Sequence, residues 1–467
     1  MQPASTRELP PVPPLPVWAQ TLALRHWPIR YLGWCRSRYG PRFTVRVLDL
    51  PPLVFLTDAS EIEAVLTAPT GTLRPGAGTE LIAPLIGERS FILSDDDDYR
   101  RALRKAIAPF VRKRAGEDNR ALIEAVTRQE LAGWPCDRTI ALYPRLSRVT
   151  LRVILTLLLG GDAEVRRLEP QLLAMLDFAR SPVVQVPRLR QLPGWRSSWR
   201  RFQLQRLRVT NALSEVIARQ ATQPKEACPV HALLDVRRDG ATLSSGEVAD
   251  NLLSLIVAGH ETTASTLAWA FLLLAQNPAV QQRLLDEIDR GEGTQYLDAT
   301  VLEALRCGPV FLFAIPRAVV ERVQAGVHSY SPPAQLLACT YLLQNDPAHY
   351  PEPHAFRPER FLDGAPSRLV WKPWGGGRRR CLGQHLAELE IRTVLRTVLA
   401  HHRVVAARSR IERAAWRSAI LAPRSGAYVV LEARDGQAGG PRRLPKAGCT
   451  RPRRDDRRPE TPPGIHI

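Results

Sequence analysis

Residues 371–383 read Trp371-Lys-Pro-Trp-Gly-Gly-Gly-Arg-Arg-Arg-Cys381-Leu-Gly383, and apolar residues at helical spacing follow them. Three consecutive glycines permit backbone angles closed to other residues and let main chain approach a flat ligand closely. We expect Cys381 where the loop becomes a helix, since free amide N–H groups and nearby cations stabilise a thiolate there. This arrangement suits a large planar metal cofactor, and haem iron is the obvious candidate. On this stretch alone, a cysteine that only packs beside a flexible loop remains the alternative.

The spacing of the motif carries more information than the cysteine itself. The pattern Trp374-Gly375-x-Gly377-x-Arg379-x-Cys381-x-Gly383 resembles the haem-binding signature of the cytochromes P450, with Trp374 where phenylalanine is usual. The resemblance implies a mainly α fold with a minor β-sheet region. It also implies haem b as cofactor, contacts to haem from the signature residues, and Cys381 as the axial iron ligand.

The resemblance also sets the expected domain organisation. A chain of 467 residues with 45% hydrophobic and 24% charged residues is ordinary globular material, and its length alone suggests two or three domains. The resemblance instead implies one domain over residues 29–434. A proline-rich leader, 1–28, precedes it, and a basic tail, 435–467, follows without apolar periodicity and is expected to be disordered.

Charge and cysteine usage bound the partners and the compartment. The net charge of +19 suits a nucleic acid, an anionic membrane surface or an acidic protein. We find no nucleic-acid motif and therefore expect no nucleic-acid partner. Seven scattered cysteines without CxxC argue against a disulfide framework or zinc site and favour a reducing compartment. With no apolar run near about 18 residues and no signal-peptide pattern, we expect a cytoplasmic protein without a transmembrane anchor.

A second motif lies within residues 251–274, which are apolar nearly all round and predict a buried central helix. Gly259 costs about 1 kcal/mol of helix propensity there. The hydroxyl of Thr262 can bond the carbonyl of Ala258, four residues back, and so bend or open the helix. A buried acid and hydroxyl at an opened turn can hold water and relay protons, and such local departures usually mark functional sites.

The same stretch strengthens the resemblance. Residues 258–263, Ala-Gly-His-Glu-Thr-Thr, match the family's oxygen-activation motif, (A/G)-G-x-(D/E)-T-(T/S), at every position. Carried over, Thr262 and Glu261 take part in proton delivery to oxygen. A packed helix with satisfied polar groups is the alternative for an isolated motif of this kind.

Two further sets of residues match the family by position. Glu303-Ala-Leu-Arg306 and the later Pro-Glu-Arg360-Phe resemble its E-x-x-R and P-E-R-F segments, which implies a buried structural network of Glu303, Arg306 and Arg360. Haem propionates require arginines. The candidates are Arg379, Arg317, Arg104 and Arg100, the last standing where the family usually has Trp or His.

The implied activity is that of a haem-thiolate monooxygenase, which inserts one atom of O₂ into an organic substrate. Residues 310–313, Val-Phe-Leu-Phe, suggest an apolar substrate cavity. Since the chain has no room for a fused reductase, electrons from NAD(P)H are expected through a separate ferredoxin- or flavodoxin-type donor. Lys372, Arg378 and Arg380 flank the cysteine loop and predict a positive surface for an acidic donor. A peroxygenase, an isomerase or a non-catalytic haem sensor are the alternatives.

Overall fold

A computed structural model describes residues 9–434, except 112–115, 223–227, 292, 327, 365 and 418. The chain divides into two units, 1–433 and 434–467, and the fold described below is that of the first. The tail predicted over 435–467 lies outside the described residues. Among the described residues, no helix combines the length and apolar character needed to cross a bilayer.

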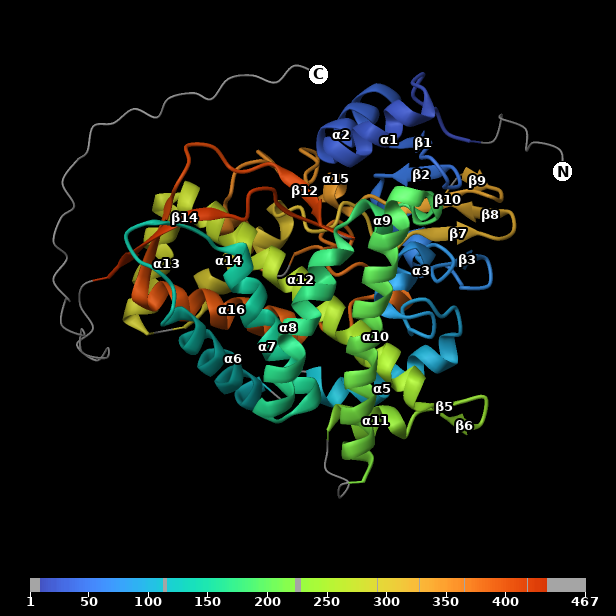
Figure 1. Cartoon of the computed structure of the whole chain (residues 1–467). Helices are drawn as coiled ribbons and strands as arrows, with labels where there is room; N and C mark the ends of the chain where they lie inside the picture. Colours follow the sequence, from blue (N-terminus) through green and yellow to red (C-terminus); the bar gives the residue numbers. More distant parts are fainter. Residues whose placement is uncertain are drawn as a thin grey trace, which may run out of the picture. The chain divides into compact units, whose positions relative to one another are not determined.

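Helices make up most of this unit (Figure 1). The α-helices are α1 (Val17–His26), α2 (Pro28–Tyr39), α3 (Ala59–Thr67), α4 (Ala83–Ile86), α5 (Asp97–Val111), α6 (Gly116–Leu131), α7 (Tyr143–Leu159), α8 (Asp162–Ala179), α9 (Pro182–Gln185), α10 (Pro193–Ala221), α11 (Pro229–Leu234), α12 (Ser245–Gln276), α13 (Pro278–Arg290), α14 (Gln295–Cys307), α15 (Thr340–Gln344) and α16 (Gln384–His401). Short 3₁₀ helices are η1 (Glu80–Ile82), η3 (Pro187–Gln191), η4 (Pro358–Phe361) and η5 (Gly377–Arg379).

The strands form one larger sheet and several small ones. They are β1 (Arg42–Val45), β2 (Leu53–Leu56), β3 (Leu73–Arg74), β4 (Thr139–Ala141), β5 (Arg237–Arg238), β6 (Ala241–Thr242), β7 (Arg317–Val319), β8 (Val323–Ala325), β9 (His328–Tyr330), β10 (Gln335–Ala338), β11 (His402–Ala406), β12 (Ala414–Arg417), β13 (Ile420–Pro423) and β14 (Tyr428–Ala433). The larger sheet has the order β1-β2-β10-β7-β3, with β10 parallel to β2 and the other pairs antiparallel. This confirms the prediction of a mainly α fold with a minor β-sheet region.

Helix α12 is the centre of the packing. A capping box between Ser244 and Glu247 begins it, and Asn277 ends it just before a proline. It packs against α7, α10 and α16, so its apolar residues are buried on every side, as the sequence predicted. The polar residues of its middle turn are thereby held inside the protein.

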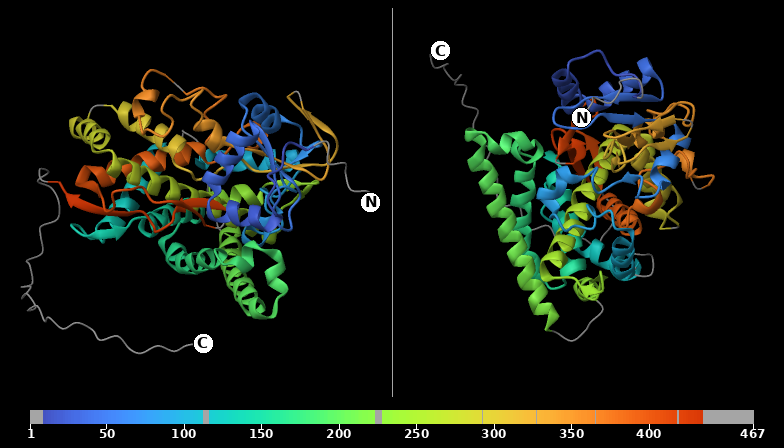
Figure 2. Two further views of the ribbon diagram at one scale, coloured as in Figure 1. Left: turned by 90° about the horizontal axis from the view of Figure 1, so that it is seen from above. Right: turned by 90° about the vertical axis from the view of Figure 1, so that its right-hand side faces the viewer.

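The described part of the leader packs against the sheet rather than standing apart from it. Thr44 of β1 donates its backbone N–H to the carbonyl of Pro11 at 2.8 Å and its hydroxyl to that of Pro10 at 2.9 Å. Gln20, on α1, is buried and accepts the N–H of Arg46 at 2.9 Å. The proline-rich leader thus includes a helix of ten residues, α1. Figure 2 shows α1 and α2 beside the strands.

Residues 70–92, although rich in glycine and proline, contain β3, η1 and α4. Hydrogen bonds from its backbone to side chains elsewhere in the protein fix this segment, despite its many glycines and prolines. Asp95 accepts the N–H of Gly76 at 2.6 Å, and the amide of Asn251 on α12 accepts the N–H of Phe91 at 2.9 Å. These bonds fix the segment between the sheet and α12.

A fully buried ion pair joins α14 to the loops that lead to the cysteine. Arg306 donates from Nε and Nη2 to the two carboxylate oxygens of Glu303, each at 2.7 Å, and neither side chain is exposed. Its Nη1 donates to the carbonyls of Gln344 and Pro353. Arg360 lies 3.4 Å from the same carboxylate. The structure thus brings together the three residues of the expected network.

We predict that Glu303→Ala lowers the free energy of unfolding by about 3–5 kcal/mol, because it leaves the Arg306 guanidinium buried without its anion. Urea unfolding followed by circular dichroism, together with haem content, measures the loss. Asp98→Ala is the matched control, since the Asp98–Arg101 pair has the same spacing but its side chains are 87% and 74% exposed. That variant should lose less than about 1 kcal/mol. Equal losses would contradict a structural role for the buried pair.

Candidate haem-thiolate site

The loop before α16 folds back on itself and presents Cys381. The N–H of Cys381 donates to the carbonyl of Trp374 at 3.0 Å, which closes the loop. Gly383 is the N-cap of α16, so the thiol lies close to the start of that helix, as predicted. Arg104, on α5, donates to the carbonyl of Arg380 at 2.8 Å and thereby contacts the backbone beside Cys381. Trp374 is half-buried, and its indole N–H has no partner among the described residues.

Two glycines of the loop are needed for its shape. Gly375 and Gly377 have φ of 66° and 58°, the left-handed region that other residues rarely adopt. A Cβ on Gly377 would stand 2.0 Å from the carbonyl oxygen of Leu66 at the end of α3. The loop therefore packs directly on α3, and no larger residue fits at position 377.

The electrostatics of Cys381 differ from the sequence prediction. Its side chain is accessible, yet protein atoms crowd it, and this burial raises the pKa of the thiol. The N–H of Gly383 and the guanidinium of Arg104 act in the opposite direction but do not overcome it. The loop by itself therefore does not make the cysteine anionic. A coordinated metal ion would, because a coordinating thiol loses its proton outright.

Three arginines from different parts of the chain are buried near one another. Arg379 precedes the cysteine, Arg317 begins β7 and Arg100 lies on α5. Burial lowers the pKa of Arg379 to about 10, of Arg317 to about 10 and of Arg100 to about 9, and the charge of Arg379 lowers the latter two further. These are mutually repelling cations held away from water.

The protein partners of these arginines are mainly neutral carbonyl oxygens, which do not neutralise the charges. Arg317 donates to the carbonyl of Ile315 at 2.6 Å, and Arg100 to that of Phe91 at 2.8 Å. Arg379 donates to the carbonyls of Ile92 and Ser94, and its contact to the carboxylate of Asp95 is 3.4 Å long. Nε of Arg379 is buried without a partner among the described residues. The donor set therefore suits an anionic group.

These residues fit haem. Its two propionates would supply the missing anionic oxygens to Arg379, Arg317 and Arg100. The accessible thiol of Cys381 would supply a sulfur ligand of the right chemistry for the iron, and the glycine loop would allow a close approach. Arg379 and Cys381 are neighbours in the loop, whereas Arg317 and Arg100 lie far from it in sequence and are brought to it by the fold.

On α12, the predicted back-bond is present. The hydroxyl of Thr262 donates to the carbonyl of Ala258 at 2.7 Å, but the helix continues through this turn without the predicted opening. Ala258 is exposed and Thr262 half-buried in a helix that is otherwise buried. Gly259 has a packing reason that the sequence did not reveal, because a Cβ there would stand 3.2 Å from the Ile154 side chain on α7.

Glu261 points into the protein. It is 6% exposed, and burial raises its pKa to about 7, while the charges of Arg180 and Arg417 pull the pKa down. Arg417 lies on β12 with its guanidinium 4.4 Å from the ring centre of Tyr143. Sequence reasoning missed these neighbours, because no spacing connects residues 143, 180 and 417 to the motif.

His260 lies beside Glu261 but has a structural environment. Its Nε2 is 2.7 Å from the hydroxyl of Ser147 on α7, and the hydroxyl of Thr150 donates to its backbone carbonyl at 3.1 Å. Burial lowers the pKa of His260 to about 3, so the ring is neutral at physiological pH. It helps to join α12 to α7.

The apolar residues 310–313, which suggested a substrate cavity, lie beside β13, and β13 contacts α12. The N–H of Leu421 donates to the carbonyl of Val310 at 2.9 Å, and the hydroxyl of Ser265 donates to the carbonyl of Leu421 at 2.7 Å. Ser265 is nearly one turn beyond Thr262. Phe311 is 44% exposed, whereas Leu312 is buried, so the apolar run contributes alternate residues to an open surface.

The positive surface predicted beside the cysteine is smaller than expected. Lys372 is buried, and its ammonium group lies 2.5 Å from the carboxylate of Glu63 and 2.7 Å from the carbonyl of Arg368. Its charge is therefore compensated inside the protein. Arg378 and Arg380 are exposed, although Arg378 is paired with Asp97.

Comparisons with known proteins place the chain among similar sequences and folds. The family model described as Cytochrome P450 matches residues 9–430. A Mycobacterium bovis protein named "Putative cytochrome P450 135B1" is 30% identical over 466 residues, which cover 96% of this chain and 97% of that protein. A Mycobacterium tuberculosis protein named "Putative cytochrome P450 138" is 31% identical over 437 residues, covering 91% and 97%. The solved structure titled "Retinoic acid bound cyanobacterial CYP120A1" matches with a TM-score of 0.79 at 23% identity, covering 91% of this chain and all of that one.

We predict that Glu261→Gln gains stability relative to wild type as pH rises. Because the folded pKa of about 7 lies above the ordinary value of 4.5, folded protein retains a proton that the unfolded chain releases. The contribution of Glu261 to the free energy of unfolding is therefore fully present below about pH 4.5. It falls as pH rises and is lost by about pH 7, a change on the order of 3 kcal/mol. Urea unfolding of both proteins at pH 5, 6, 7 and 8 measures the difference. Titration of His260 cancels in that difference, and a difference independent of pH would refute the assignment.

Proposed function

The chain belongs to the cytochrome P450 family, and from that premise we propose that it oxygenates an apolar organic substrate with haem bound to Cys381. The observation that supports this best is the group of three buried arginines around the loop of an accessible cysteine, whose charges the 3.4 Å contact between Arg379 and Asp95 offsets only in part. A protein without a dianionic cofactor would have no use for such a group, since burying like charges is costly.

Haem ligated by thiolate would supply the electron chemistry that activates O₂. The chain's own residues bind and orient it. Arg379, Arg317 and Arg100 hold the propionates, Cys381 holds the iron, and Gly377 lets the loop lie flat on α3. Arg104 stabilises the loop through the carbonyl of Arg380.

Proton supply is assigned to α12. Glu261, with a pKa of about 7, both holds and releases a proton near neutral pH. Thr262 lies next to it on the accessible side of the helix, where its hydroxyl donates to Ala258 in the resting arrangement. By rotating away from that carbonyl, the hydroxyl can pass a proton toward the substrate side. This pair favours a monooxygenase over a peroxygenase or an isomerase, which need no such protons.

We propose that electrons come from NAD(P)H through a separate ferredoxin- or flavodoxin-type donor, which docks near the exposed Arg378 and Arg380. The described cysteines are all free, which supports a reducing compartment such as the cytoplasm. The exposed ring of Phe311 next to α12 supports an apolar substrate.

We predict that Cys381→Ala loses the red-shifted Soret band of the ferrous-CO complex, because alanine cannot ligate iron. Absorbance spectra of the reduced, CO-treated protein measure this. Cys136→Ala removes another exposed cysteine and is the control, which should keep the band. A thiolate spectrum in Cys381→Ala would overturn the proposed function.

Thr262→Ala is expected to keep haem and substrate binding but to lower the product formed per NAD(P)H by about 10-fold or more, since general acid–base groups typically contribute about 10²–10⁴-fold. The lost electrons should appear as hydrogen peroxide. Thr263→Ala is the control, because Thr263 makes the same type of back-bond, to Gly259 at 2.9 Å, but is buried. Unchanged coupling in Thr262→Ala would show that protons take another route. A haem sensor would form no product with any surrogate reductase.

For the donor, we predict that Arg380→Glu slows ferredoxin reduction by about 10-fold at low salt, and that added salt slows the wild-type reaction, because electrostatic steering is screened. Stopped-flow reduction measures both. Arg322→Glu, which reverses an exposed arginine just beyond β7 in the larger sheet, should change little. Rates that respond to neither salt nor Arg380→Glu would rule out docking at this loop.

A further inference from the structure

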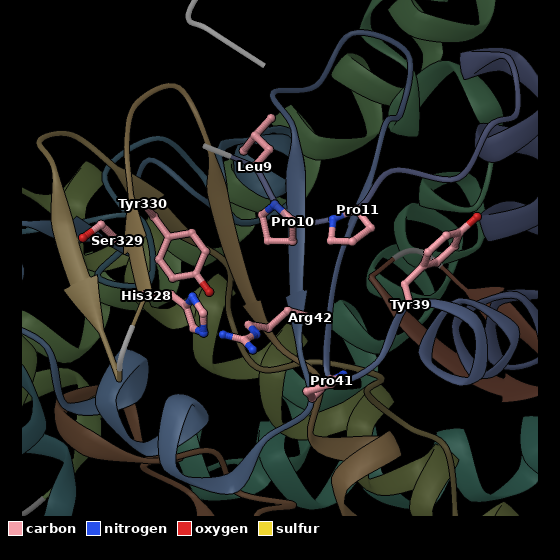
Figure 3. Close-up of a pocket in the computed structure, with 9 residues that line it drawn as sticks. All are labelled: Leu9, Pro10, Pro11, Tyr39, Pro41, Arg42, His328, Ser329 and Tyr330. Carbon is pink, nitrogen blue, oxygen red and sulfur yellow. The ribbon is translucent and has the colours of Figure 1, made fainter. Parts of the chain in front are cut away.

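A pocket lies between the leader and the edge of the larger sheet, and it is separate from the proposed haem site. Its volume is about 320 Å³, and its walls come from the leader, β1 and β9 (Figure 3). Pro10 and Pro11 form one side, Arg42 of β1 the floor, and His328 and Tyr330 of β9 the other side. None of the proposed cofactor, proton-delivery or network residues lines it.

The walls of this pocket are fixed in place. Thr44 of β1 holds the carbonyls of Pro10 and Pro11 through two hydrogen bonds. On the opposite side, β8 and β9 pair as an antiparallel hairpin, with Val323 opposite Tyr330. Hydrogen bonds therefore hold both sides of the pocket in position.

Its polar groups are hydrogen-bond donors that converge. Tyr330 is only 1% exposed, and its hydroxyl has no partner among the described residues. Figure 3 shows that hydroxyl directed toward His328 and the guanidinium of Arg42. A buried hydroxyl without a partner is uncommon, because leaving it unsatisfied costs free energy.

The acidic residue that contacts these donors is Glu61, which pairs with Arg42 but does not line the pocket. Glu61 on α3 accepts from Nη1 of Arg42 at 3.2 Å, and its Oε1 is 4.0 Å from Nε2 of His328. Burial raises the pKa of Glu61, and the residues that line the pocket include no Asp or Glu. The pocket thus offers an arginine, an imidazole and a phenol to its occupant, and these groups suit a carboxylate better than a cation.

We propose that this pocket binds a small carboxylic acid, with its carboxylate among Arg42, His328 and Tyr330 and its apolar part against the leader prolines and Tyr39. The volume is that of a small-ligand site and holds a single-ring molecule. Binding would bridge the leader and the β8–β9 hairpin.

Benzoate is the probe, and benzamide, the uncharged molecule of the same shape, is its control. Calorimetric titration of full-length holoprotein, with imidazole saturating the haem iron, should show benzoate binding that benzamide lacks. Tyr330→Phe should weaken it by about 10-fold, the loss of one hydrogen bond to a charged group. Tyr31→Phe removes a buried hydroxyl outside the pocket and should leave binding unchanged.

Because the Tyr330 hydroxyl has no partner, Tyr330→Phe should fold with a melting temperature no lower than that of wild type, so weaker binding cannot be attributed to unfolding. Arg42→Lys, which keeps the charge but loses the planar fork, should also weaken binding. The proposal is overturned if benzamide binds as well as benzoate. It is equally overturned if Tyr330→Phe binds benzoate like wild type, or if imidazole abolishes binding.

Discussion

Repulsion among three buried guanidinium groups is the constraint on which the rest of this structure depends. Arg379, Arg317 and Arg100 come from the cysteine loop, β7 and α5, so the fold brings like charges together out of water. Asp95 offsets part of this repulsion, and an anion bound between the guanidinium groups would offset more of it. Folding and haem binding are therefore thermodynamically linked, since a ligand that binds only the folded state stabilises it by mass action.

A second important feature is that the middle turn of α12 has a buried face and a more accessible face. Glu261 is turned into the protein, where burial keeps it close to neutral, while Thr262 and Ala258 are on the more accessible side. Gly259 lets α7 approach, and His260 is hydrogen-bonded to that helix. A carboxyl group of raised pKa and a hydroxyl group thus occupy adjacent residues in different environments, as the proposed proton delivery requires, and packing on α7 keeps them there.

Much of this could be predicted from the sequence, because the motifs are local. The spacing around Cys381, the motif of residues 258–263 and the E-x-x-R pair each lie within a short stretch, and the apolar stretch of residues 251–274 predicted most of α12, which spans Ser245–Gln276. What could not be predicted depends on contacts between distant residues. The burial of Lys372 requires Glu63, and the environment of Glu261 requires Arg417. The pKa of Cys381 was predicted with the wrong sign, because the sequence shows neighbouring cations but not the crowding of the thiol.

The hydrogen bond from the indole of Trp416 to the carbonyl of Leu24, 3.0 Å long, spans 392 residues of chain. It joins α1, among the first segments to leave the ribosome, to the β12–β13 hairpin, among the last. That hairpin also holds α12 through Ser265. During synthesis, α1 therefore has no partner at Trp416 until nearly the whole chain has emerged, and contacts of such long range form slowly. Closure around the central helix is thus expected late in folding, when these two distant segments meet.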